Sequence, residues 1–350
     1  MSMNSQSKHF SGTIGQTIAP TDFPSSNYII DDSKYDYEGN WAFCRFNSEA
    51  ILAARFGFGR GMLDLSDYGA NIVPSKSYLW LHIELMTSEG AVLWLCTEKF
   101  KAEMVAIKKD SLDIEFVYGR HEIFSIHGWP QMKWHFESDD REVEISMEFN
   151  IRNVTILPDN IMPLNLFAMW LAFCDINGSI RINGKQIQVT GTAFYDHPRI
   201  NVQYHEVPTF GWYLYTPMRF SDGSYLAAYY TETADGDAVD YYCFGLYIDN
   251  TGKSIWLEKT KITSIAFDDD NKPKSWVMQL DGREMEITID ACVTDTSISK
   301  IWGNPIVPKT RKENGNIPLV FDCEVKIAKN NVSNVVTGEG LAEYIRHARL

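Results

Sequence analysis

The sequence has no apolar run near the roughly 18 residues that a membrane-spanning helix requires. Residues 1–12 are polar and contain neither an apolar signal region nor an Arg-rich amphipathic stretch. The cysteines lie far apart, with no CxxC pair and no spacing typical of a zinc site. We expect buried free thiols at all six, Cys44, Cys96, Cys174, Cys243, Cys292 and Cys323. These absences predict a soluble, cytoplasmic protein without a transmembrane segment.

The sequence also has few basic residues. It contains 32 Lys and Arg and 46 Asp and Glu, so its formal net charge is -14. This charge repels phosphate backbones and anionic lipid, so nucleic acid is not an expected partner. Residues 57–61, Gly-Phe-Gly-Arg-Gly, lack the Lys-Ser/Thr of a phosphate-binding loop, and the sequence has no G-x-S-x-G elbow. Strand alternation could bring two of His121, His127 and His135 to one face, but metal ligation needs a third ligand. We therefore expect no metal.

Helical patterns are scarce. Residues 163–175 and 341–350 are the candidates for short helices, and the first could equally be a buried strand. Elsewhere the period is two, as where Val143, Ile145 and Met147 alternate with polar residues. The Asn-Gly pair at 183–184 lies between two alternating runs and predicts a type I′ hairpin turn. We expect roughly fifteen to eighteen short strands in an all-β protein.

The length of 350 residues is long for one core, because domains usually hold roughly 100 to 200 residues. Residues 1–27 are rich in Ser, Thr, Gly and Pro without a regular period, which predicts an extended N-terminal arm. The hairpin pattern then fills the chain, with a join between residues 185 and 200. We predict two antiparallel β-barrels or sandwiches, at residues 28–188 and 189–350.

Aromatic residues are abundant, with 10 Trp, 17 Tyr and 19 Phe making up 13% of the chain. Such rings supply large, rigid apolar surfaces. Two interpretations remain open at this point. The rings can fill two ordinary β cores, or they can line a cavity for an apolar ligand.

The most informative stretch is residues 189–198, which follows the Asn-Gly hairpin and contains Asp196 beside His197. An acid and an imidazole together can donate and accept protons, and burial would raise the pKa of Asp196 so that it holds a proton near neutrality. The alternative is that Asp196 caps a turn before Pro198 while His197 faces solvent. A second polar and aromatic cluster follows at residues 204–206 and 210–215.

Residues 191–197, Gly-Thr-Ala-Phe-Tyr-Asp-His, resemble the G-x-G/A-aromatic-x-D-H signature of a lipocalin-like superfamily. It includes AttH proteins, the carotenoid hydratase hydroxyneurosporene synthase and Diels-Alderase-type cyclases. Residues 336–344 resemble its closing G-x-G-aromatic-x-E-Y element, and residues 38–43 resemble the first strand of the first barrel. The similarity spans most of residues 35–345. This sequence has Ala193 where Gly is common, Phe194 where many relatives have Tyr, and Pro198 in place of the usual polar residue after His. A hydroxyl that could assist proton transfer is thus missing at position 194.

The resemblance implies two lipocalin-like (calycin-type) barrels that enclose a hydrophobic small molecule, with no metal and no organic cofactor. By residue matching, Asp196 would donate a proton and His197 would orient it or hold its proton. The rings of Phe194 and Trp212 would stabilise a carbocation through their π faces. The substrate-binding candidates are Trp41, Phe194, Tyr195, Tyr204, His205, Trp212, Tyr215 and Tyr225.

The function that this resemblance implies is a cofactor-independent lyase or isomerase. It would hydrate, isomerise or cyclise a hydrophobic, unsaturated terpenoid or polyketide. The first alternative is a non-catalytic lipocalin-like carrier or sensor of a hydrophobic small molecule. The second is a glycan-binding or structural β protein that uses surface rings such as Trp256 and Trp302. Neither the substrate nor the oligomeric state follows from the sequence.

Overall fold

The structure is a computed structural model built from β-strands. It describes residues 16–18, 37–60, 78–87, 92–101, 105–110, 113–118, 121–127, 131–138, 141–157, 167–200, 210–233, 235–238, 243–269, 272–296, 315–329 and 332–346. Within these ranges the chain forms 21 strands in two antiparallel sheets and no helix. The predicted all-β, lipocalin-like fold class is confirmed, with more strands than the alternation alone indicated.

The first sheet contains twelve strands. They are β1 (Gln16–Ile18), β2 (Tyr37–Phe46), β3 (Ala53–Arg60), β4 (Tyr78–Met86), β5 (Val92–Lys101), β6 (Val105–Asp110), β7 (Asp113–Tyr118), β8 (His121–His127), β9 (Gln131–Glu137), β10 (Val143–Leu157), β11 (Phe167–Ile182) and β12 (Lys185–Ile200). Their order is β5-β4-β3-β2-β12-β11-β10-β9-β8-β7-β6, and β1 pairs with β10.

The second sheet contains nine strands. They are β13 (Phe210–Phe220), β14 (Tyr225–Thr233), β15 (Phe244–Ile248), β16 (Ser254–Leu257), β17 (Lys259–Phe267), β18 (Pro273–Asp281), β19 (Met285–Thr296), β20 (Gly315–Lys329) and β21 (Val332–Arg346). Their order is β16-β15-β14-β13-β21-β20-β19-β18-β17. The N–H of Thr260 in β17 donates to the carbonyl of Cys243 at 3.0 Å, which links the last strand of this sheet to the residue before β15.

Both helix candidates are wrong where the structure describes them. Residues 167–175 belong to β11, which pairs with β10 and β12, and residues 341–346 belong to β21, which pairs with β13 and β20. Short apolar runs do not distinguish a buried strand from a helix, and pairing on both sides settles these two. The predicted hairpin at Asn183 and Gly184 is confirmed, since both have positive φ, 50° and 77°.

The change from the first sheet to the second follows β12, between residues 200 and 210. The expected join at 188/189 therefore lies inside β12, whose later half pairs with β2 and β11. Of the expected arm, residues 16–18 form β1 and the others lie outside the described residues. The division into two folding domains stays a prediction.

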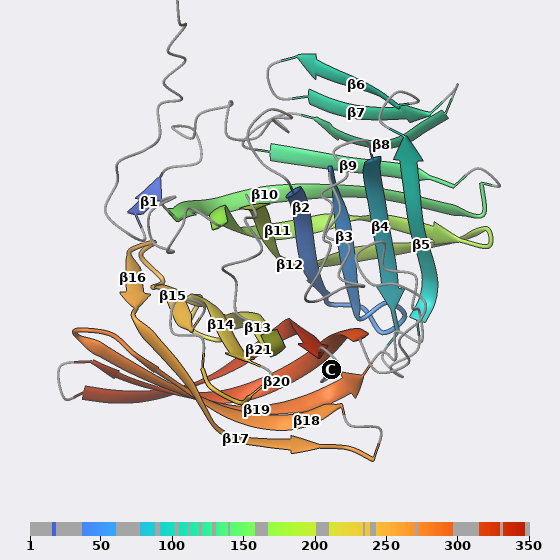
Figure 1. The fold of residues 1–350 in the computed structure, drawn as a ribbon. Helices are drawn as coiled ribbons and strands as arrows, with labels where there is room; N and C mark the ends of the chain where they lie inside the picture. Colours follow the sequence, from blue (N-terminus) through green and yellow to red (C-terminus); the bar gives the residue numbers. More distant parts are fainter. Residues whose placement is uncertain are drawn as a thin grey trace, which may run out of the picture.

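The two curved sheets lie one against the other (Figure 1). Each sheet has an apolar core of its own, and a third cluster of buried residues joins the sheets. We call this third cluster the intersheet layer. From the first sheet it contains Trp41, Phe43, Ala53, Met86, Leu171, Phe173 and Phe194. From the second it contains Tyr215, Tyr225, Ala227, Tyr229, Phe244, Leu246, Ile248, Val320 and Leu341.

Free thiols are found at all five described cysteine side chains. Cys44, Cys174, Cys243 and Cys323 are buried, as expected, but Cys292 is exposed. On β19 the side chains alternate, so the burial of Ala291 turns Cys292 to the outer face. The side chain of Cys96 lies outside the described residues.

Candidate functional site

Asp196 lies on β12, directly opposite Trp41 of β2 and Leu171 of β11. Directly opposite residues in an antiparallel pair share a face of the sheet, and both of these neighbours belong to the intersheet layer. Asp196 is 5% exposed, so its carboxyl is buried between the two sheets. This placement excludes the alternative in which Asp196 caps a turn.

The neighbouring His197 points the other way. Successive side chains of a strand lie on opposite faces, so Tyr195 and His197 face the core of the first sheet. The Tyr195 hydroxyl donates to Asn40 Oδ1 at 2.8 Å on that side, and both His197 and Tyr195 are fully buried. The structure therefore does not bring the imidazole of His197 to the face that holds the Asp196 carboxyl.

The surroundings of the Asp196 carboxyl favour its neutral form. Burial raises the pKa of Asp196 well above its ordinary value, and the charge of Glu343 raises it further. The hydroxyl of Tyr215, from the opposite sheet, acts in the other direction without reversing the shift. The Oδ1 atom of Asp196 is buried and has no hydrogen-bond partner among the described residues.

Two tyrosines of the second sheet complete this part of the site. The rings of Tyr215 and Tyr229 are stacked, with centroids 4.2 Å apart, and the Tyr215 ring also contacts Phe43 and Phe194 edge-on. Burial raises the pKa of both phenols well above the ordinary value, and the proximity of Asp196 adds to the shift. The Tyr215 hydroxyl is buried and finds no hydrogen-bond partner within the described ranges.

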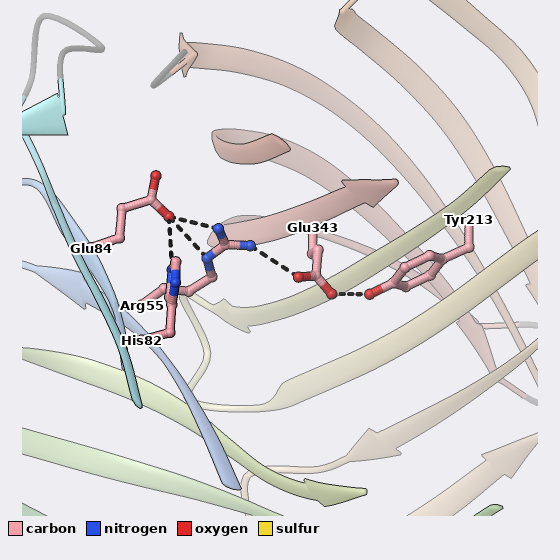
Figure 2. A network of polar contacts seen from close by, with 5 residues as sticks. All are labelled: Arg55, His82, Glu84, Tyr213 and Glu343. Carbon is pink, nitrogen blue, oxygen red and sulfur yellow. Dashed lines mark hydrogen bonds and ion pairs between the residues drawn. The ribbon is translucent and has the colours of Figure 1, made fainter. Parts of the chain in front are cut away.

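A network of charged groups lies in the same layer (Figure 2). Arg55 of β3 donates from Nε and Nη2 to Glu84 Oε2 of β4, at 3.1 and 2.6 Å. Its Nη1 donates to Glu343 Oε1 of β21 at 2.9 Å, so one guanidinium joins the two sheets. The Tyr213 hydroxyl donates to Glu343 Oε2, and His82 Nε2 lies 3.6 Å from Glu84 Oε2.

The pKa values in this network move in different directions. Burial raises the pKa of Glu84, but the charge of Arg55 and hydrogen bonds from His82 and Arg55 outweigh it, so the net pKa is lowered. Burial lowers the pKa of His82, against the hydrogen bond to Glu84. Burial raises the pKa of Glu343 to about 7, although Arg55 opposes the shift. Glu84 is therefore the ionised partner of Arg55, whereas Glu343 can gain or lose a proton near neutrality.

Trp41 is positioned by a glycine on the next strand. A Cβ atom on Gly57 would lie 2.4 Å from the Trp41 ring, so only glycine allows this close approach. The Trp41 ring also contacts His82, with centroids 5.6 Å apart. Trp41 thus forms an aromatic wall between Asp196 and the charged network.

Besides Tyr195, Asp196 and His197, the predicted site residues fall into three groups. Trp41, Phe194, Tyr215 and Tyr225 lie in the intersheet layer, where Tyr225 contacts Phe173 with centroids 4.4 Å apart. Trp212 lies on the inner face of the second sheet, where its Nε1 donates to Glu232 Oε2 at 2.7 Å. Tyr204 and His205 lie outside the described residues.

Sequence reasoning missed the charged network of Arg55, His82, Glu84, Tyr213 and Glu343. A signal was present in the apolar run of β4, where His82 and Glu84 are two residues apart and so share one face. Glu343 lies in the closing motif, without any indication of a partner. The pairing of Arg55 with Glu343 joins residues 288 positions apart and required the tertiary structure.

Side chains of both sheets also line a half-open pocket of about 20 Å³, among them Phe43, Phe173, Phe194 and Tyr225. This volume holds about one water molecule. In the part of the chain that the structure describes, no group of three His, Cys, Asp or Glu side chains is arranged to hold a metal ion. None of the described elements is a helix long and apolar enough to cross a membrane.

Neither a family model nor a curated protein matches this chain. Among solved structures, it is similar to an AttH-type protein from Nitrosomonas europaea, with a TM-score of 0.60 and 13% identity over 95% of this chain and 97% of that one. CghA, solved with Sch210972, matches with a TM-score of 0.59 and 11% identity over 97% and 96%. The chain thus has the lipocalin-like fold that its Asp-His and closing motifs predicted, shared with AttH-type proteins and CghA along almost its entire length.

Proposed function

We propose that this protein is a cofactor-independent lyase or isomerase with Asp196 as its general acid. Its substrate would be a hydrophobic, unsaturated terpenoid or polyketide, which it would hydrate, isomerise or cyclise. The observation that carries the proposal is a buried carboxyl whose pKa is raised well above the ordinary range, in an aromatic layer between two sheets. A carboxylic acid that keeps its proton at neutral pH can deliver it to a substrate.

The chemical step begins with transfer of the Asp196 proton to one carbon of a double bond. The π electrons form the new C–H bond, the adjacent carbon becomes a cation, and Asp196 becomes a carboxylate. Rings of Trp41, Phe194 and Tyr215 offer π faces that stabilise such a cation. Addition of water, loss of a different proton or attack by a second double bond then gives hydration, isomerisation or cyclisation, and a proton returns to Asp196.

The groups around Asp196 support its return to the neutral form. A newly formed Asp196 carboxylate would lie near Glu343, and repulsion between two buried carboxylates favours recapture of a proton. Tyr215 can stabilise the transient carboxylate because its hydroxyl is close enough to lower the pKa of Asp196. The fold shared with CghA, whose structure contains Sch210972, supports a ligand site in this architecture.

Asp196→Asn tests the proposal. We would purify wild type and variant from the native host and identify any bound small molecule by native mass spectrometry. The variant should carry substrate where the wild type carries product, and turnover of that substrate should fall by at least about a hundredfold, the typical share of a positioned acid. Asp290→Asn, at an exposed position on β19, is the matched control. An identical ligand in both proteins would instead identify a carrier.

A further inference from the structure

Asp196 Oδ1 and the Tyr215 hydroxyl oxygen are buried in the intersheet layer. Neither atom has a hydrogen-bond partner among the described residues. They come from opposite sheets, β12 and β13, and their groups are close enough to interact. Buried polar atoms in native proteins nearly always have partners, so an unpaired couple indicates that a ligand atom completes it. We propose that Asp196 and Tyr215 together bind a carbonyl oxygen of the substrate, which makes the substrate class a conjugated enone.

This inference rests on the proposed function, because it names the substrate class of the same site. Burial favours the protonated form of both groups, because it raises the pKa of each well above its ordinary value. Two neutral O–H groups are two donors, and a carbonyl oxygen has two lone pairs that can accept from both. A hydrocarbon polyene offers no acceptor and would leave both donors unpaired.

The charges nearby select a neutral acceptor over an anionic one. The pKa of Glu84 is lowered, which favours its ionised form, and Glu343 adds a second carboxyl from the opposite sheet. A ligand carboxylate would add a negative charge beside these groups, with Arg55 already bound to both. A ketone or enone oxygen carries no net charge and meets only the two donors.

The surrounding rings fit the remainder of an enone. Tyr215 is held by its stacked neighbour Tyr229, and Phe43, Phe173 and Phe194 supply apolar surface around it. Such packing fixes the phenol direction, so the donor is preorganised before the ligand arrives. Apolar walls with a few convergent polar groups are typical of small-molecule sites.

Donation to the carbonyl changes the chemistry that the site can perform. Hydrogen bonds to the oxygen withdraw electrons from the conjugated double bond, so its β-carbon becomes electrophilic. Water can then form a C–O bond there while the π electrons move to the oxygen as an enol or enolate. A proton delivered to the α-carbon restores the carbonyl, and the proton that the added water loses replaces it, so that one water is added across the double bond. Ketosteroid isomerase uses the same pairing of a phenol with a neutral carboxylic acid to stabilise an enolate.

The test compares two probes of similar shape, benzalacetone, an aromatic enone, and trans-β-methylstyrene, which has the alkene without the carbonyl. Their affinities would be measured by titration calorimetry for the wild type, Tyr215→Phe and Asp196→Leu. Each variant should bind benzalacetone about three- to tenfold more weakly, the effect of one lost hydrogen bond, and should bind the hydrocarbon as before. Tyr230→Phe is the matched control, since its hydroxyl donates to Glu232 in the second sheet.

A second readout uses the wild type alone and so does not depend on the stability of a variant. Infrared difference spectra of wild type with carbonyl-labelled benzalacetone should show a C=O stretch at lower frequency than in water, because two preorganised donors polarise the bond. Absence of benzalacetone binding, unchanged affinity in Tyr215→Phe, or an unshifted stretch would overturn the carbonyl site. Loss of turnover in Asp196→Asn together with any of these results would leave the general acid in place and refute only the enone.

Discussion

Three carboxyl groups and one guanidinium are buried between the sheets, and the guanidinium is bound to two of these carboxyl groups. Glu84 and Glu343 both accept hydrogen bonds from Arg55, and the charge of Glu343 acts on Asp196. One positive charge cannot compensate three negative charges in a medium of low dielectric constant. Protonation of a carboxyl lowers this excess of buried negative charge, which is why the pKa values of Asp196 and Glu343 are raised.

The titration of Glu343 should appear in the stability of the protein. The ordinary pKa of this carboxyl is 4.5 and its folded pKa is about 7, so between these values the folded state binds more protons than the unfolded state. Its contribution to the unfolding free energy must then fall as pH rises through this window. Urea unfolding would measure the unfolding free energy of the wild type and of Glu343→Gln at pH 5 and at pH 8. From pH 5 to pH 8 the wild type should lose stability relative to the variant. An equal difference at both pH values would contradict the raised pKa.

At the scale of elements, the packing of β2 beside β3 requires a close approach of the Trp41 ring to Gly57. A Cβ atom on Gly57 would meet the Trp41 ring at 2.4 Å, so Gly57→Ala should force the ring away and destabilise the fold by about 1–3 kcal/mol. In a Trp41→Leu background the same change should cost much less, because the obstructing ring is gone. A double-mutant cycle by urea unfolding measures this difference. The same cost in both backgrounds would show that the contact does not limit packing.

The side chains of β12 alternate between two faces, and this decides which residues of its motif can act together. Phe194 and Asp196 face the intersheet layer, whereas Tyr195 and His197 face the core of the first sheet. A pair that is adjacent in sequence is therefore divided between two environments. The groups that shift the pKa of Asp196, Glu343 and Tyr215, come from β21 and β13 of the second sheet. Adjacency along the chain gives no information about them.

For the whole molecule, the intersheet layer should make the two sheets unfold together. Phe149 is fully buried in the core of the first sheet, and its truncation to Ala should cost about 3–5 kcal/mol. If the sheets are coupled, Phe149→Ala lowers hydrogen-exchange protection in β19 of the second sheet as well as in β10. Phe267→Ala, at a side chain 42% exposed, is the control and should change neither. Loss of protection in the first sheet alone would show two independent units.

Much of the fold followed from local patterns. Alternation predicted the all-β class, and the Asn183-Gly184 turn was predicted because positive φ at both positions suits this pair. Asp196 was found because an acid at the end of an aromatic strand stands out from its neighbours. The two short apolar segments that also suited helices were decided by pairing with strands on both sides.

The sequence by itself determined that the chain is β-rich, acidic and aromatic, because composition and periodicity act within a few residues. Only the tertiary structure decided that Arg55 meets Glu84 and Glu343, since the latter contact spans 288 residues. It also placed Tyr215 opposite Asp196 and removed His197 from that face. The protonation of the buried carboxyls depends on burial and on charges brought from distant strands, and neither is encoded in the local spacing of residues.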